Sequence, residues 1–275
     1  MAPIHQAPPS QMFRARPRVA RAHAARTVAA PFGDGGMAPL LDLDEDLGRG
    51  LTPALYEQVR RWLVVPVWSL RRGRWAAGPQ SGDDMMGLLV LDGVIARSVS
   101  LGRIAYPELL GAGDLLRPWQ PHPHPGPLAV QVEWQVIEPS RVAVLDHRFG
   151  SLVCRWPEVV NELVGRAQRR ADELDLHMAI AQLPLIELRL LGVLWHIAAR
   201  WGVDTPEGVH VPVRLTHAVL AALVLGRRSS TSRALTSLAR RGLVSHVPDG
   251  WMLHGEPPRE LHTLSRTTGH DALGD

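Results

Sequence analysis

The sequence predicts an α+β protein with an N-terminal jelly-roll β-barrel, a long central dimerisation helix and a C-terminal winged helix-turn-helix. Short apolar runs broken by Gly, Pro and Asp occupy residues 38–150, a texture typical of β-sandwiches and barrels. A heptad-like apolar pattern follows. Two short amphipathic segments separated by a glycine, and then two strand-like segments, come after it. A length of 275 residues suits about two such domains.

We expect five segments: a disordered basic arm (1–37), a β-roll (38–155), the dimerisation helix (156–184), the winged helix-turn-helix (185–255) and a disordered tail (256–275). The first 36 residues are rich in Ala, Pro and Arg and have no acid before Asp34, a composition that disfavours a packed core. We expect this arm to be disordered, and two alternatives stay open: the arm contacts DNA, or the protein starts at Met37 and lacks the arm.

Several short runs predict the strands of the β-roll, and a helix around residues 53–61 precedes them. The strand candidates are 62–67, 87–91, 93–99, 129–137 and 141–145.

The central helix is expected to begin near Pro157, because proline suits the first turn of a helix. Apolar residues then recur at spacings of three and four, which predicts a parallel homodimer. The alternative is a helix that packs only on its own β-roll. Pro184 must kink or end this helix, and a further apolar helix over 188–198 ends before Gly202. The predicted dimerisation residues are Val164, Ala167, Ala171, Leu174, Met178 and Ala181.

The C-terminal pattern predicts two helices joined by a tight turn. The Thr216 hydroxyl can cap the first helix, and Gly226 supplies a permissive backbone for the turn. The second helix opens with arginines and small hydroxyl residues, ends at Gly242, and is followed by a two-stranded wing around 243–253.

This segment has the chemistry of a DNA-binding surface. Residues 214–247 contain six arginines and no carboxylate, and a positive field of this kind suits phosphate binding. Arginine can bond guanine through two atoms, while Ser and Thr reach phosphates or base edges. An ordinary helical hairpin is the alternative. The predicted DNA-binding residues are Thr216, Arg227, Arg228, Ser229, Ser230, Ser232 and Arg233.

Residues 215–243 resemble the C-terminal domain of the Crp/Fnr family of bacterial transcription regulators. The matching residues include Thr216, Leu220, Ala221, Leu223 and Val224, followed by Arg228, Arg233 and Leu235 in the second helix. The resemblance implies that Arg228, Ser229 and Arg233 read bases. It departs from the family at Leu225, which takes the usual glycine position, and at Ser229, which replaces a glutamate; the target site is therefore expected to differ from the common palindrome.

The β-roll resembles a cyclic-nucleotide-binding domain, with Gly111, Gly113 and Asp114 in its Gly-x-Gly-Asp turn. The family's nucleotide-binding helix is replaced here by residues 118–128, where prolines surround His122 and His124. Proline lacks an N–H and breaks helices, so we expect no tight binding of cAMP or cGMP. The two histidines lack a third metal ligand in the sequence, and we expect a solvated loop without metal or other cofactor.

The function predicted from the resemblance is a Crp/Fnr-type, sequence-specific transcription regulator; the alternative is a DNA-free dimeric interaction or ligand-sensing protein. Its expected partners are double-stranded DNA, a second copy, RNA polymerase and an unidentified small-molecule effector. No catalytic motif is present, and Cys154 is expected to be a packed thiol, so we predict no enzyme. No long apolar run or signal pattern is found, which predicts a cytoplasmic protein with no membrane partner.

Overall fold

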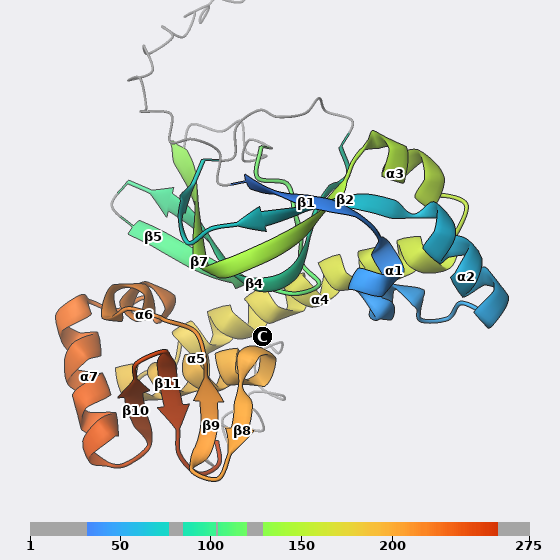
Figure 1. Ribbon diagram of the computed structural model, residues 1–275. Coiled ribbons are helices and arrows are strands. Elements are labelled where there is room, and N and C mark those ends of the chain that lie inside the picture. Colours follow the sequence, from blue (N-terminus) through green and yellow to red (C-terminus); the bar gives the residue numbers. More distant parts are fainter. Residues whose placement is uncertain (1–31, 77–84, 103, 120–128, 258–275) are drawn as a thin grey trace, which may run out of the picture.

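The computed structural model describes residues 32–76, 85–102, 104–119 and 129–257. They form an N-terminal sheet domain and a C-terminal helical domain, and the long helix α4 passes behind both in Figure 1. The strands are β1 Phe32–Pro39, β2 Val64–Leu70, β3 Gly73–Trp75, β4 Gly87–Leu101, β5 Ile104–Leu110, β6 Leu115–Leu116, β7 Val130–Leu145, β8 Val203–Thr205, β9 Gly208–Val211, β10 Val244–Val247 and β11 Gly250–Leu253. The helices are α1 Leu40–Leu43, α2 Pro53–Trp62, α3 His147–Val153, α4 Pro157–Ala181, α5 Ile186–Trp201, α6 His217–Leu223 and α7 Arg228–Arg240, with a 3₁₀ turn at Glu45–Gly48.

The N-terminal domain is built on one antiparallel, seven-stranded sheet. Its main strand order is β1-β2-β7-β4-β5, while β3 pairs with β7 and β6 pairs with β4. The expected β-roll is therefore present, but the sheet is open, because β1 and β5 at its two ends do not pair with each other. β1 begins at Phe32, inside the segment expected to be a disordered arm; residues 1–31 lie outside the described part of the chain.

Strands β4 and β7 are long and pair along almost their whole length, from Gly87 opposite Leu145 to Leu101 opposite Val130. The pairing is irregular between Val90 and Ile95, where Gly93 has φ +86°. A Cβ on Gly93 would lie 2.4 Å from the Pro139 carbonyl oxygen, so only glycine fits this bend. The runs predicted as separate strands at 87–91 and 93–99 are thus one bent strand.

Alternating residues of these two strands serve two different cores. Leu88 and Val90 face the interior of the roll, where Trp75 and Trp134 pack edge to face. Leu89, between them, faces the opposite side and packs with the helices α1, α2 and α3 and the first half of α4. The period-two alternation expected of a strand places these side chains on opposite faces.

A third core joins the domains. Val94, Ala96 and Ile137 of the sheet pack in one cluster with side chains of α5, α6, α7, β9 and β11. The two domains are therefore in direct apolar contact as well as being joined by the chain.

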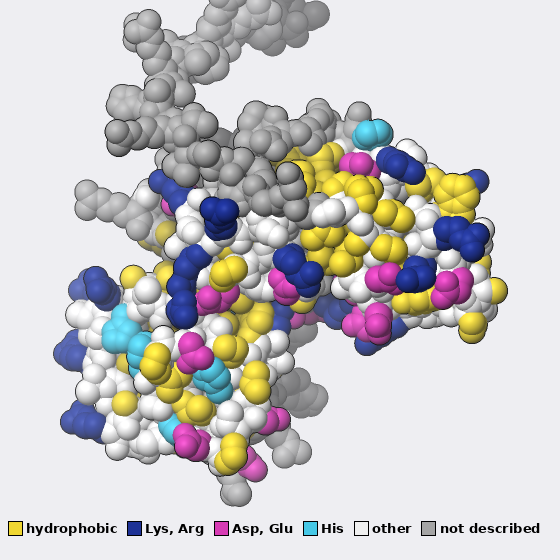
Figure 2. Space-filling view, viewed as in Figure 1, with side chains coloured by type: hydrophobic (Ala, Val, Ile, Leu, Met, Phe, Trp, Pro, Cys, Tyr) yellow, Lys and Arg dark blue, Asp and Glu magenta, His cyan; other side chains and the backbone are white. Residues whose placement is uncertain are grey.

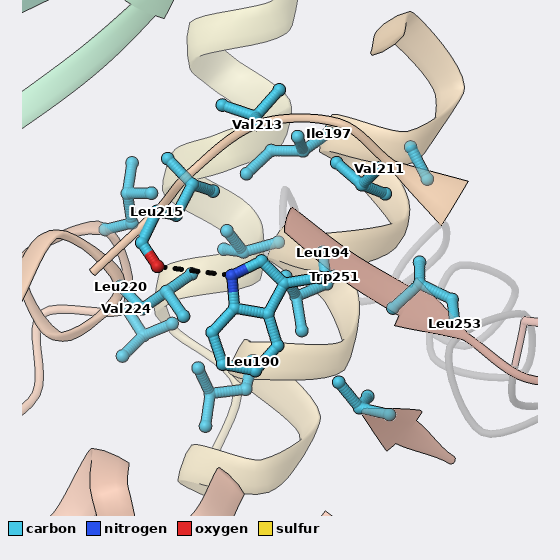
Figure 3. Packing of buried hydrophobic residues seen from close by; sticks show 14 of the residues in the cluster. Leu190, Leu194, Ile197, Val211, Val213, Leu215, Leu220, Val224, Trp251 and Leu253 are labelled. Carbon is cyan, nitrogen blue, oxygen red and sulfur yellow. Dashed lines mark hydrogen bonds between the residues drawn. The ribbon is translucent and has the colours of Figure 1, made fainter. Parts of the chain in front are cut away.

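The C-terminal domain packs α5, α6 and α7 against the four-stranded sheet β10-β11-β9-β8. Trp251 lies at the centre of this core, where its indole N–H donates to the Leu215 carbonyl at 3.2 Å (Figure 3). It is 3% exposed and is surrounded by side chains of α5 such as Leu190 and Leu194. The wing predicted around 243–253 is β10 and β11; strands β8 and β9 extend it and were not predicted.

The predicted helix boundaries follow local signals closely. α4 begins at Pro157 and ends at Ala181, before Pro184, so the proline separates α4 from α5 instead of kinking one helix. α5 ends at Trp201, before Gly202, as expected. Helices α1 and α3 were not predicted, because each is only about one or two turns long and gives no clear periodicity.

Candidate nucleic-acid interface

The pair α6–α7 begins and turns at residues that the sequence had singled out. Thr216 caps α6, its hydroxyl accepting the Val219 N–H at 3.3 Å. The turn differs from expectation: Leu225, not Gly226, adopts the left-handed conformation, with φ +50°. Gly226 is needed for space, since a Cβ there would lie 2.8 Å from Ile186 Cδ1 and 3.2 Å from Thr231 Oγ1.

We expect Leu225→Gly to stabilise the protein by about 0.5–1 kcal/mol, because a β-carbon in the left-handed region costs energy that glycine avoids. Leu225 is 47% exposed, so little packing is lost. Chemical denaturation measures the change, with Leu225→Ala as the control that keeps the unfavourable φ. An equal or lower free energy of unfolding for the glycine variant would contradict the strain.

Helix α7 presents one polar stripe to solvent and one apolar stripe to the core. Ala234, Leu235 and Leu238 are buried. Residues three or four apart share a face of a helix. The face opposite the buried one carries four exposed residues at this spacing: Ser229, Arg233, Thr236 and Arg240. Among them Thr236 and Arg240 were not singled out from the sequence, although the same spacing rule identifies them.

The other predicted contact residues surround the start of this stripe. Arg227 and Arg228 are exposed where α7 begins. Ser230 is half-buried. Ser232 is also half-buried, and its hydroxyl lies 3.0 Å from Nδ1 of His217, the first residue of α6. Ser232 therefore joins the two helices, and His217 enters the candidate surface as a residue that the sequence alone did not identify.

The surface formed by α7 is strongly basic. Dark blue arginine side chains line the edge of the C-terminal domain where α7 lies (Figure 2). The ion pairs of the described residues include none with Arg227, Arg228 or Arg233. The charges of these arginines thus remain available to an anionic partner.

Four of the six predicted dimerisation residues are exposed on α4, and we call the side of the helix that carries them its outer face. Val164 is 62% exposed and Met178 45% exposed, Ala167 and Ala171 are exposed, and Leu174 is half-buried. Ala181 departs from the prediction: it is 4% exposed within its own chain and offers no surface to a second copy. The buried face of the same helix carries Leu163, Arg166 and His177 instead.

Two side chains hold the last carbonyls of α6, which have no partner within the helix. His177 of α4 donates from Nε2 to the Leu223 carbonyl at 2.9 Å, and Arg189 of α5 donates to the Val224 carbonyl at 3.4 Å. Burial lowers the pKa of His177, and the hydrogen bond to Leu223 opposes this shift. A neutral imidazole with its proton on Nε2 satisfies the carbonyl without burying a charge.

Three further expectations concern sites of other kinds. Cys154 is exposed, not packed, because it follows the last turn of α3 at the surface. His122 and His124 lie outside the described residues. Within the described ranges no group of three or more His, Cys, Asp or Glu side chains is placed to hold a metal ion, and no helix there is long and apolar enough to cross a membrane.

Comparisons with known proteins agree with this arrangement. Residues 188–254 match the family model of the Crp-like helix-turn-helix domain. No curated protein matches the sequence.

Several solved structures share the fold. A CooA mutant from Carboxydothermus hydrogenoformans superposes with a TM-score of 0.57 at 16% identity, covering 86% of this chain and 100% of its own. FixK2 from Bradyrhizobium japonicum gives 0.55 at 15% identity, covering 74% and 98%. A Crp/Fnr-family transcriptional regulator from Thermus thermophilus gives 0.52 at 17% identity, covering 74% and 100%. Residues 188–254 therefore form a Crp-like helix-turn-helix domain, and the chain shares the fold of these solved structures over most of its length.

Proposed function

We propose that the protein recognises an inverted-repeat DNA site as a homodimer, without control by cAMP or cGMP. The observation that carries this proposal is the exposed stripe of α7, in which Ser229, Arg233, Thr236 and Arg240 follow one another along the solvent-facing side of the helix. A helix with this pattern has the width and hydrogen-bonding groups for the major groove.

The proposal assigns a role to each predicted DNA-binding residue. Arg228 and Arg233 bond base edges, with Ser229 beside them, while Ser230 and Arg227 contact phosphates. Thr216, at the exposed start of α6, lies where the preceding helix of such a motif approaches the backbone of DNA. Ser232 contributes by fixing α7 to α6 through His217.

The dimer is proposed to form through the outer face of α4. Val164 and Met178 leave apolar surface exposed along this helix, and Ala167 and Ala171 between them allow a second helix to approach closely. Two-fold symmetry would place the two copies of α7 about 34 Å apart, one turn of DNA. Four residues of the predicted seam are exposed to a second copy, Leu174 is half-buried, and Ala181 is buried and left out of the proposed contact.

Selection of genomic DNA by the purified full-length protein, with no added ligand, tests the proposal. Enrichment of an inverted repeat with half-sites about one turn apart is the expected result. Enrichment of a single half-site would contradict the dimer. Failure to enrich any sequence, with no dependence of DNA affinity on salt, would favour the alternative of a dimeric interaction protein that does not bind DNA.

Independence from cyclic nucleotides rests on the proline-rich sequence of residues 118–128, most of which lies outside the described structure. We expect calorimetric titration with cAMP or cGMP to give no binding at micromolar concentrations, and DNA affinity to be unchanged by either nucleotide. Micromolar or tighter binding would contradict this part of the proposal. An effector of another class and contact with RNA polymerase belong to the proposal as well, as does action in the cytoplasm.

A further inference from the structure

Three charged side chains meet where the two domains touch: Asp114 in the turn after β5, Glu173 on α4 and Arg200 near the end of α5. We call them the interdomain ion-pair cluster. Arg200 Nη2 donates to Asp114 Oδ2 at 2.6 Å and to the Ala112 carbonyl at 3.2 Å. Its Nη1 donates to Glu173 Oε2 at 3.0 Å. One guanidinium therefore binds the sheet domain and the central helix from within the C-terminal domain.

The turn that supplies Asp114 is fixed to the sheet. The Gly111 N–H donates to Asp114 Oδ2 at 2.8 Å, and the Gly113 N–H donates to the Val90 carbonyl at 2.9 Å. Burial raises the pKa of Asp114, and the nearby Arg200 opposes this shift. Without Arg200 the buried carboxylate would keep the Gly111 N–H but lose its described ion-pair partner, so the charge of Asp114 depends on Arg200.

The neighbouring Trp201 fixes the same end of α5. A Cβ on Gly111 would lie 2.7 Å from Trp201 Nε1, so this tryptophan lies directly against the turn. The guanidinium of Arg200 lies 4.9 Å from the centroid of the Trp201 ring. A planar guanidinium held by an aromatic ring and two carboxylates has few orientations available, which makes this contact directional as well as attractive.

The orientation of α5 determines that of α7. Leu190 and Leu194 of α5 share a core with Leu235 and Leu238 of α7. Arg189 of α5 also holds the end of α6 through the Val224 carbonyl. A rotation of α5 relative to α4 would therefore carry α7 with it.

We propose that Arg200 is a positioning residue that determines the half-site spacing the dimer accepts, by holding the C-terminal domain at one angle to α4 and to the sheet. The inference rests on the proposed function. Adjacent base pairs are separated by about 3.4 Å along DNA, so a small rotation of each domain changes the spacing that two copies of α7 can match. The stripe of α7 stays exposed in this arrangement, so the cluster orients the reading surface without covering it.

The first experiment compares the protein with Arg200→Gln and Glu173→Gln on operators whose half-site spacing is changed by one or two base pairs. We expect the unaltered protein to lose at least tenfold in affinity for each change. Arg200→Gln should lose no more than about threefold, and Glu173→Gln, which keeps the bond to Asp114, should fall between them. Affinity for a single half-site should change less than twofold. Arg169→Gln is the control, because Arg169 pairs with Glu162 on the same helix, outside the cluster.

The second experiment needs no DNA. Spin labels at Glu57→Cys on α2 and Thr236→Cys on α7, in a Cys154→Ser background and diluted with unlabelled protein, report the distance between the domains. We expect a narrow distribution that Arg200→Gln broadens and Arg169→Gln leaves unchanged. Equal distributions for the three proteins would overturn the positioning role whatever the DNA experiments give.

The two experiments separate the possible failures. If no DNA is bound but Arg200→Gln broadens the distances, the proposed function fails and the orientation of the domains by Arg200 stands. If DNA is bound and Arg200→Gln keeps the original spacing preference, the inference fails and the proposed function stands. A loss of half-site affinity by folded Arg200→Gln would also overturn the inference, since it would show damage to the reading surface itself.

Discussion

Arg233→Ala and Arg228→Ala should each weaken binding to the selected site by about 1–3 kcal/mol, roughly 5- to 150-fold. Both side chains are exposed on α7 and form none of the described ion pairs, so their removal should leave the fold unchanged. An arginine that bonds guanine contributes discrimination as well as affinity, because its two donors match two acceptors found together only on that base. The loss should therefore be accompanied by relaxed preference at one position of each half-site.

Fluorescence anisotropy with the selected site and its single-base variants measures both quantities. Arg61→Ala, which removes an equal charge from α2 at the far end of the N-terminal domain, is the control. Arg227→Ala should weaken binding to all sequences alike and reduce the salt dependence, since a phosphate contact carries no sequence information. If Arg228→Ala and Arg233→Ala both retain full specific affinity, the assigned reading face of α7 is wrong.

Placing charge on the outer face of α4 should have a still larger effect on site affinity. In the double variant Val164→Glu with Met178→Glu, two-fold symmetry would bring like charges together in an apolar seam. We expect a monomer that binds the full inverted repeat at least 100-fold more weakly. In a dimer the second α7 is already held next to the second half-site, whereas two monomers must bind the two half-sites independently. Sedimentation velocity and binding to the full site measure the two effects.

Leu176→Glu provides a matched control. Leu176 is 51% exposed on the same helix but lies outside the predicted seam. It should leave the dimer and its DNA affinity unchanged. Dissociation by Leu176→Glu, or a dimer that survives the double substitution, would place the dimer contact on another surface.

Local sequence signals predicted the parts of the molecule that depend on neighbouring residues. Thr216 caps α6, Pro157 opens α4, and Gly242 follows α7 with φ +65°, as hydroxyl capping, the fixed φ of proline and the freedom of glycine require. The exposed arginines of α7 follow from the same periodicity, because the apolar positions that define the buried face also define the exposed one.

Other features depend on contacts that no local pattern encodes. β8 and β9 are only a few residues long, and they become strands because β9 pairs with β11. Ala181 fits the apolar repeat of α4 but is buried in its own chain. The hydroxyl of Ser232 is held by His217, fifteen residues earlier in the chain.

The sequence by itself determined the order of the domains, the boundaries of the helix-turn-helix and the charge of its surface, because these depend on side-chain type and short-range spacing. Only the tertiary structure decided how the two domains are oriented. Asp114 and Arg200 are 86 residues apart, and their ion pair exists because the apolar core shared by the sheet and α5 brings the two elements together. Long-range packing selects such a pair, and for that reason the positioning role of Arg200 could be inferred only from the folded chain.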